Sequence, residues 1–221
     1  MVKVKICGNQ TSDDLKVTAK ADAVGFIVAT PESPRNIEPK TASRLVKETP
    51  PFTSTVMVTT VVEPKVLCEL VVKVEPDYLQ LHSTLTLSRT KEIARSMPNA
   101  TGIIALITVK ENLDDLKNRA LKLANSPVDA LLLDSKSEGR TGGTGHVHDW
   151  NISRTIRDTV HPAPVILAGG LDPENVGKAI CKVRPYAVDV ATGVEKDEDK
   201  SDQKVERFME EVNDSEVKSV P

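Results

Sequence analysis

A glycine-rich stretch with two histidines is the first part of this sequence that could carry chemistry. It runs from Gly139 to Trp150 as GRTGGTGHVHDW and follows an apolar segment, DALLLD, that ends in a carboxylate. Three interpretations are open. Its backbone N–H groups could cradle a phosphate, His146 and His148 could bind a metal, or a flexible loop could close over a site. The elements on either side decide between them.

Short β-branched runs alternate with amphipathic stretches along the chain, which is the pattern of alternating strands and helices. Eight strands are predicted, at Val2–Cys7, Ala23–Val28, Ser54–Thr59, Tyr78–His82, Gly102–Ile107, Asp129–Asp134, Pro164–Gly169 and Ala187–Thr192. Helical patterns lie between them, among them Pro39–Lys47, Thr86–Met97, Leu113–Ala124 and Glu174–Val183, and a last one follows at Asp202–Val212. Asp172 and Pro173 are typical of a helix start, as N-cap and first helical residue.

Eight strand–helix units in 221 residues predict an α/β fold, a single (β/α)8 TIM barrel with eight parallel strands inside outer helices. We expect the barrel to be one catalytic domain over residues 1–214 and residues 215–221 to be a frayed C-terminal tail.

Charge and cysteine content exclude several classes of partner. The chain has 29 basic and 32 acidic residues, a net charge of −3, so it lacks a broad basic field for nucleic acid or an anionic membrane. Its three cysteines are widely spaced, which favours neither a disulfide framework nor a zinc site and suits a reducing compartment. Neither a signal peptide nor an apolar run of membrane-spanning length is evident. We therefore expect a cytoplasmic protein that binds no nucleic acid and no membrane.

Strand alternation places polar side chains inside the predicted barrel. If Val4 and Ile6 face the helices, Lys5 and Cys7 face the interior. The same alternation on later strands adds four interior side chains, Gln80, His82, Asp134 and Asp189. Cys7, His82 and Asp134 stand at the C-terminal strand ends, where barrels of this kind hold their active sites. Because an unpaired buried charge is costly, this polar interior indicates an internal ion pair or a ligand.

Six short motifs lie in register with six of the predicted strands. In chain order they are KICG, GFIV…SPR, LQLH, LLLD…GGTG…DW, LAGGLDPENV and VDVATGVE. Together they resemble the phosphoribosylanthranilate isomerase family of tryptophan biosynthesis. The resemblance implies an Amadori rearrangement of N-(5-phospho-D-ribosyl)anthranilate to 1-(2-carboxyphenylamino)-1-deoxy-D-ribulose 5-phosphate. It also implies that no cofactor and no metal are needed.

By this resemblance Asp134 is the general acid and Cys7 the general base. The acid protonates the furanose ring oxygen, and the base removes the C2 proton to form the enolamine. With ordinary pKa values of about 3.9 for Asp and about 8.5 for Cys, Asp134 would be ionised and Cys7 protonated at neutral pH, which is the opposite of what these roles require. We therefore expect partial desolvation beneath a closed loop and a nearby substrate anion to raise the Asp134 pKa, and a cation, with Lys5 as our candidate, to lower the Cys7 pKa.

The same resemblance implies a small-molecule substrate with a carboxylate and a phosphate. Arg35 of the SPR motif is expected against the anthranilate carboxylate, which a guanidinium can bind with two parallel hydrogen bonds. Asp189 is expected either beside the substrate or as the ion-pair partner of Lys5. Short glycine-bearing turns after the seventh and eighth strands predict the phosphate site, with the residues Gly169, Gly170, Ala191, Thr192 and Gly193.

The barrel assignment changes the interpretation of the glycine-rich stretch. Fifteen residues, Ser135–Asp149, separate the sixth strand from its helix, whereas βα connections usually have about two to six. This length favours a lid with hinges at Gly142, Gly143 and Gly145 over a phosphate cradle. Two histidines without a third ligand nearby make a metal site the weakest interpretation.

The match to the family has departures, and two rival functions stay open. Departures occur at Thr59, Thr60, Ser83, His148 and Ala191, and a charged run, EKDEDKSD, stands where the family tends to have a glycine before the final helix. They bear on the phosphate contacts and the rate. The rivals are another phosphosugar TIM-barrel enzyme and a catalytically silent phosphate-binding barrel. The sequence is compatible with a monomer and with a homodimer.

Overall fold

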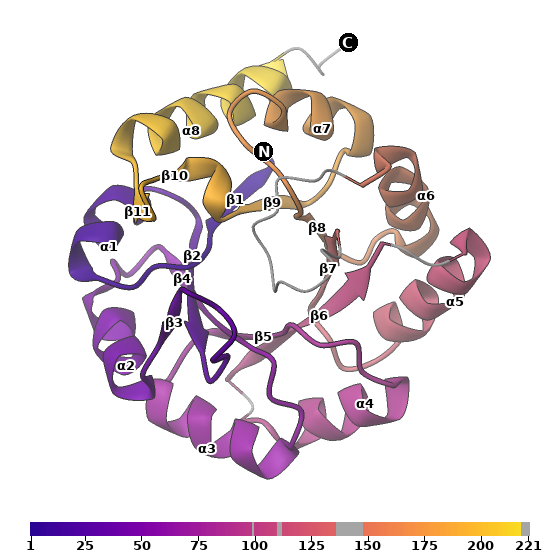
Figure 1. The fold of residues 1–221 in the computed structure, drawn as a ribbon. Helices are drawn as coiled ribbons and strands as arrows, with labels where there is room; N and C mark the ends of the chain where they lie inside the picture. The colour runs from indigo at the N-terminus through magenta and orange to yellow at the C-terminus, as the bar shows by residue number, and fades with distance from the viewer. Residues whose placement is uncertain (99, 110–111, 136–147, 218–221) are drawn as a thin grey trace.

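A closed parallel barrel forms the centre of the molecule, and helices surround it (Figure 1). The computed structural model describes residues 1–98, 100–109, 112–135 and 148–217. Its barrel strands are β1 Lys3–Ile6, β2 Ala23–Val28, β4 Ser54–Thr59, β5 Tyr78–Leu81, β6 Gly102–Thr108, β7 Ala130–Asp134, β8 Val165–Leu167 and β9 Ala187–Val190. Neighbouring strands pair in parallel, and β9 pairs with β1 to close the ring. The predicted (β/α)8 barrel is therefore confirmed.

The helices follow the strands in order around the outside of the barrel (Figure 1). They are α1 Ser12–Thr18, α2 Pro39–Glu48, α3 Pro64–Val74, α4 Leu87–Ser96, α5 Leu113–Ala124, α6 Trp150–Val160, α7 Val176–Val183 and α8 Asp202–Val217. Proline at the first position starts α2 and α3, where its missing N–H costs nothing. Asp149 caps α6, because its side chain accepts a hydrogen bond from Asn151 N. No described helix is long and apolar enough to cross a membrane.

Two helix ends differ from the sequence prediction. Helix α7 begins at Val176, and Asn175 rather than Asp172 occupies its N-cap position. The Asp172 carboxylate instead accepts from Glu174 N in a separate turn before the helix. Helix α8 continues through Val217, past the predicted end at Val212 and past the predicted domain boundary at 214. Ser215 is buried there, and its hydroxyl donates to Val212 O, so this part of the expected frayed tail is helical.

Side chains alternate between the barrel interior and the outer layer as the strand pattern predicts. Val4, Ile6, Val188 and Val190 pack in the layer between strands and helices. A separate interior cluster contains Cys7, Val56, Val58, Ile104, Leu106, Leu132, Ile166, Ala168 and Ala187. Lys5, Gln80 and Asp189, which share the inward parity, are also buried.

A short hairpin connects the last barrel strand to α8 and lies beside α1 (Figure 1). After a 3-10 turn, η1 Thr192–Val194, strand β10 Glu195–Lys196 pairs antiparallel with β11 Asp199–Lys200. The two turn residues, Asp197 and Glu198, have φ angles of +52° and +72°. Positive φ at both central residues is what a two-residue type I′ turn requires, and Asn-Gly adopts it at the lowest cost. The charged run therefore makes a hairpin whose turn residues are poorly suited to their backbone conformation.

We expect the double substitution Asp197→Asn with Glu198→Gly to stabilise the protein by about 1 kcal/mol, because it relieves left-handed backbone strain at the turn. Urea unfolding followed by far-UV circular dichroism measures the change. Asp197→Asn with Glu198→Gln removes the same charges without glycine and is the matched control. A glycine variant no more stable than this control would contradict the strained-turn account.

Candidate active site

One cavity at the C-terminal ends of the barrel strands brings most of the predicted site residues together. Its lining includes Cys7, Arg35, Asp134, Asp189, Gly169, Gly170, Ala191 and Thr192. Gly193 does not line it. A side chain at Gly193 would collide with the carbonyl oxygen of Leu171, so its place is explained by close packing of the turn. The lid residues Gly142, Gly143 and Gly145 lie outside the described residues. The cavity also includes Thr30, Ser33, Thr60 and Ser135, for which the sequence analysis predicted no binding role.

Cys7 is held rigidly just beyond the end of β1. Its N–H donates to Val190 O at 2.8 Å, and the N–H groups of Gly8 and Asn9 both donate to Gly25 O at 3.0 Å. Gly8 has a φ of +81°, and a Cβ there would lie 2.5 Å from Cδ of Arg35. Glycine in the KICG motif thus lets the arginine side chain cross directly over the residue after the thiol.

The electrostatic environment of Cys7 differs from the sequence prediction. Burial raises the pKa of the thiol above its usual range, and Asp189 adds to this increase. Lys5 lowers the pKa, as expected, and so does Lys200, but burial outweighs both cations. The predicted net lowering of the Cys7 pKa was therefore wrong. Cys7 is only 7% exposed, and the loss of water destabilises its thiolate more than the two lysines stabilise it.

The pKa of Asp134 is raised as predicted, but the anion that adds to the effect of burial is Asp189 and not the substrate. Asp134 ends β7, and burial together with the negative charge of Asp189 raises its pKa to about 7, against the opposing effects of Ser135 N–H and Lys5. Gly169 keeps space open beside this carboxyl, since a Cβ there would lie 2.8 Å from Oδ1. A carboxyl with this pKa is about half protonated near neutral pH and can donate a proton.

His82 lies near Asp134 without forming an ion pair with it. Its Nε2 is 3.8 Å from Asp134 Oδ2, and burial, followed by the charge of Lys5, lowers its pKa. The other ring nitrogen, Nδ1, lies 3.4 Å from the Gln80 amide nitrogen. His82 is thus a neutral residue of the cavity wall, in keeping with the interior position predicted for it.

Asp189 forms the internal ion pair that the sequence left as one of two alternatives. Lys5 Nζ donates to both of its carboxylate oxygens at 2.9 Å, and both side chains are buried. Asp189 also lines the cavity, so the carboxylate of the ion pair is part of the cavity wall. Burial alone would lower the pKa of Lys5, but Asp189 and Cys7 raise it, which keeps the ammonium charged.

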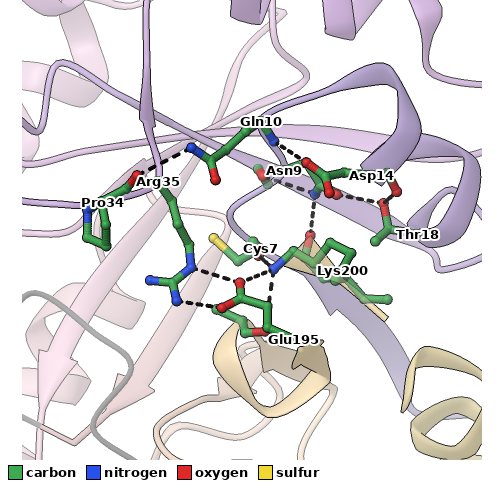
Figure 2. A network of polar contacts seen from close by, with 12 residues as sticks. Cys7, Asn9, Gln10, Asp14, Thr18, Pro34, Arg35, Glu195 and Lys200 are labelled. Carbon is green, nitrogen blue, oxygen red and sulfur yellow. Dashed lines mark hydrogen bonds and ion pairs between the residues drawn. The ribbon is translucent and has the colours of Figure 1, made fainter. Parts of the chain in front are cut away.

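A second group of buried charges surrounds Arg35 and was missed from the sequence. The guanidinium donates through Nε and Nη2 to the two carboxylate oxygens of Glu195, at 2.7 and 2.5 Å (Figure 2). Lys200 Nζ donates to the same carboxylate and to Cys7 O, both at 2.6 Å. Glu195 stands in the VDVATGVE motif, but Lys200 is in the charged run, and only the hairpin pairing places the two side by side.

Comparison with known proteins assigns the chain to a family. The family model described as N-(5'phosphoribosyl)anthranilate (PRA) isomerase matches residues 4–211. An N-(5'-phosphoribosyl)anthranilate isomerase of Methanosarcina acetivorans is 41% identical, covering 95% of this chain and 92% of the relative. One of Halobacterium salinarum is 42% identical over 88% of each chain.

Solved structures agree with these sequence relatives. The phosphoribosyl anthranilate isomerase of Thermotoga maritima superposes with a TM-score of 0.81 at 33% identity, over 97% of this chain and 100% of that one. A structure described as monomers of the dimeric Thermotoga maritima enzyme has a TM-score of 0.80 at 31% identity, with the same coverage. A third, at 0.78 and 32% identity, also with the same coverage, is a complex with reduced 1-(o-carboxyphenylamino)-1-deoxyribulose 5-phosphate. The chain therefore belongs to the N-(5'-phosphoribosyl)anthranilate isomerase family.

Proposed function

We propose that this isomerase of tryptophan biosynthesis rearranges N-(5-phospho-D-ribosyl)anthranilate with Asp134 as general acid and Cys7 as general base. The observation that carries the proposal is a single cavity at the catalytic end of the barrel lined by a buried thiol and by a carboxyl whose pKa is about 7. The aminoaldose becomes the aminoketose 1-(2-carboxyphenylamino)-1-deoxy-D-ribulose 5-phosphate.

The reaction needs two proton transfers on opposite parts of one sugar. Protonated Asp134 gives its proton to the furanose ring oxygen as the bond from that oxygen to C1 breaks, and the nitrogen lone pair forms the Schiff base. The Cys7 thiolate then takes the proton from C2. The electrons of that C–H bond form the C1–C2 double bond, and the C=N π electrons return to nitrogen. The enolamine so formed tautomerises to the aminoketone.

The protonation states limit how much of the enzyme is ready to react. The pKa of Asp134 is about 7, whereas burial raises that of Cys7 above its ordinary value. The reactive form carries a proton on the more acidic group and lacks one on the less acidic group. Because Asp134 is the more acidic of the two groups, that form is a minor fraction of the free enzyme.

Arg35 and the turn residues suit the two anionic ends of the substrate. Arg35 lines the cavity and is held from one side by Glu195, so we assign its guanidinium to the anthranilate carboxylate. Gly169, Gly170, Ala191 and Thr192 line the cavity after β8 and β9, so we assign their backbone groups to the phosphate. Gly193 then supports this turn through packing instead of contacting the phosphate.

The proposal includes a cytoplasmic setting and a homodimer or monomer as the working form. The free cysteines Cys7, Cys68 and Cys181 suit a reducing compartment. Sedimentation at micromolar concentration distinguishes the two quaternary states.

We expect the chain to restore tryptophan-free growth to cells that lack the isomerase, and Cys7→Ala and Asp134→Ala to abolish this rescue, with kcat/KM reduced by about 10²- to 10⁴-fold. Growth assays and steady-state kinetics on purified protein measure both effects. Cys181→Ala removes an exposed thiol and is the matched control, which should rescue. If the parent protein failed to restore growth, the alternative of a catalytically silent phosphate-binding barrel would be favoured. If Cys7→Ala and Asp134→Ala both restored growth, the roles assigned to Cys7 and Asp134 would be wrong.

We expect kcat/KM to rise about tenfold per pH unit up to about pH 7, where Asp134 titrates, to stay level, and to fall only above the higher, raised pKa of Cys7. Below pH 7 only the thiolate fraction changes. Between the two pKa values the loss of protonated Asp134 and the gain of thiolate cancel, and above both values the acid is lost. Initial rates at constant ionic strength give the profile. If kcat/KM stopped rising near pH 4 instead of near pH 7, the raised pKa of Asp134 would be contradicted.

A further inference from the structure

The buried charges around Arg35 do not balance. Arg35 and Lys200 are two cations that share one carboxylate, Glu195, which leaves a formal excess of one positive charge (Figure 2). The side chains are 12%, 1% and 6% exposed in the order Arg35, Lys200, Glu195. Nearby, Lys5 and Asp189 form a pair of their own and contribute no net charge. A buried charge without a counter-ion is costly, so this arrangement favours an anion in the adjacent cavity.

Burial lowers the pKa of Lys200 against the opposing effect of Glu195, but the contacts of its side-chain nitrogen indicate that it is charged. Its Nζ has three acceptors: Cys7 O at 2.6 Å, Glu195 Oε1 at 2.6 Å and Ala191 O at 3.4 Å. Three acceptors match the three protons of an ammonium, whereas a neutral amine has only two to donate. Glu195 is ionised as well, because hydrogen bonds from Arg35 and the charge of Lys200 outweigh burial and lower its pKa.

The excess charge reaches the cavity through Arg35, the most exposed of the three. Glu195 occupies Nε and Nη2 of the guanidinium, and Nη1 makes no hydrogen bond to the part of the chain that the structure describes. If Lys200 were absent, Arg35 and Glu195 would form a neutral pair that attracts an anion only weakly.

We propose that Glu195 and Lys200 are positioning residues of the carboxylate subsite. Glu195 fixes the orientation of Arg35, and Lys200 offsets the charge of Glu195, so that Arg35 meets the anthranilate carboxylate with a net positive charge. The inference rests on the proposed function, since it takes the anion at Arg35 to be that carboxylate.

The hairpin supplies both positioning residues at once. Glu195 on β10 lies directly opposite Lys200 on β11, and Lys204 at the start of α8 donates to Glu195 O at 2.6 Å. The two side chains approach Arg35, which lies 160 positions earlier in the chain in the loop before β3 Asn36–Ile37. Lys200 also joins this subsite to the main chain of the proposed base, through Cys7 O.

A pair of ligands that differ only in charge distinguishes an electrostatic role of Lys200 from a merely structural one. The reduced product analogue carries the carboxylate, and its carboxamide counterpart has nearly the same shape without the charge. Loss of structure weakens both ligands together, whereas loss of the positive charge weakens the carboxylate alone. The ratio of their two inhibition constants is therefore the measurement.

We expect the parent to bind the carboxylate about 10- to 100-fold more tightly than the carboxamide, since a charge-assisted hydrogen bond is replaced by a neutral one. Lys200→Met and Lys200→Gln should remove most of this preference, and Lys200→Arg should keep it. Gln can still donate hydrogen bonds, so it separates charge from hydrogen bonding if the Met variant folds poorly. Lys196→Met removes an exposed charge from the same hairpin and is the matched control, with an unchanged ratio.

Adding Glu195→Gln to Lys200→Gln restores a net charge of +1 on Arg35, and we expect the preference for the carboxylate to return in part. An unchanged ratio in Lys200→Gln, or a lost ratio in Lys200→Arg, would overturn the inference. The two proposals can fail separately. A parent protein that binds neither ligand and does not turn over substrate would contradict the proposed function. An active parent protein whose ratio of inhibition constants does not change on substitution of Lys200 would contradict only the role given to Glu195 and Lys200.

Discussion

The pairing of buried charges at the catalytic end of the barrel is the constraint on which the rest of the site depends. Five ionisable side chains, Lys5, Asp189, Arg35, Glu195 and Lys200, surround the thiol of Cys7 with little access to water. Each would destabilise the fold if left unpaired. Their hydrogen bonds therefore determine where these side chains lie, and one of these bonds, from Lys200 Nζ, is accepted by the carbonyl oxygen of Cys7.

Burial also determines the proton positions at the two proposed catalytic groups. It favours the neutral form of any acid, so it raises the pKa of Asp134 toward neutrality and raises that of Cys7 as well. One shared environment cannot easily move two acids in opposite directions. Lys5 and Lys200 lower the pKa of Cys7, but they do not overcome the effect of burial.

Strand alternation made much of this site predictable. The period of two in VKVKIC and AVDVAT places Lys5, Cys7 and Asp189 inside, because an outward lysine or aspartate would be buried under helices. The Lys5–Asp189 pair could be anticipated for that reason. The roles of Glu195 and Lys200 could not, because they depend on a two-residue hairpin whose turn, Asp197 and Glu198, lacks the residues that usually announce one. The net direction of the Cys7 pKa was also out of reach, since it is a difference between desolvation and attraction that only distances and burial can decide.

The raised pKa of Cys7 has a chemical advantage as well as a cost. A higher pKa makes the thiolate rarer, but it also makes each thiolate a stronger base, and removal of a proton from carbon is faster with a stronger base. The net positive charge at Arg35 and Lys200 is close enough to be neutralised either by that thiolate or by the substrate carboxylate. On the proposed roles of Arg35 and Cys7, a bound carboxylate would take over part of this stabilisation, and the thiolate would become less stable and more basic. The roles proposed for Arg35 and Cys7 therefore depend on one shared charge, the excess positive charge of the Arg35, Glu195 and Lys200 cluster.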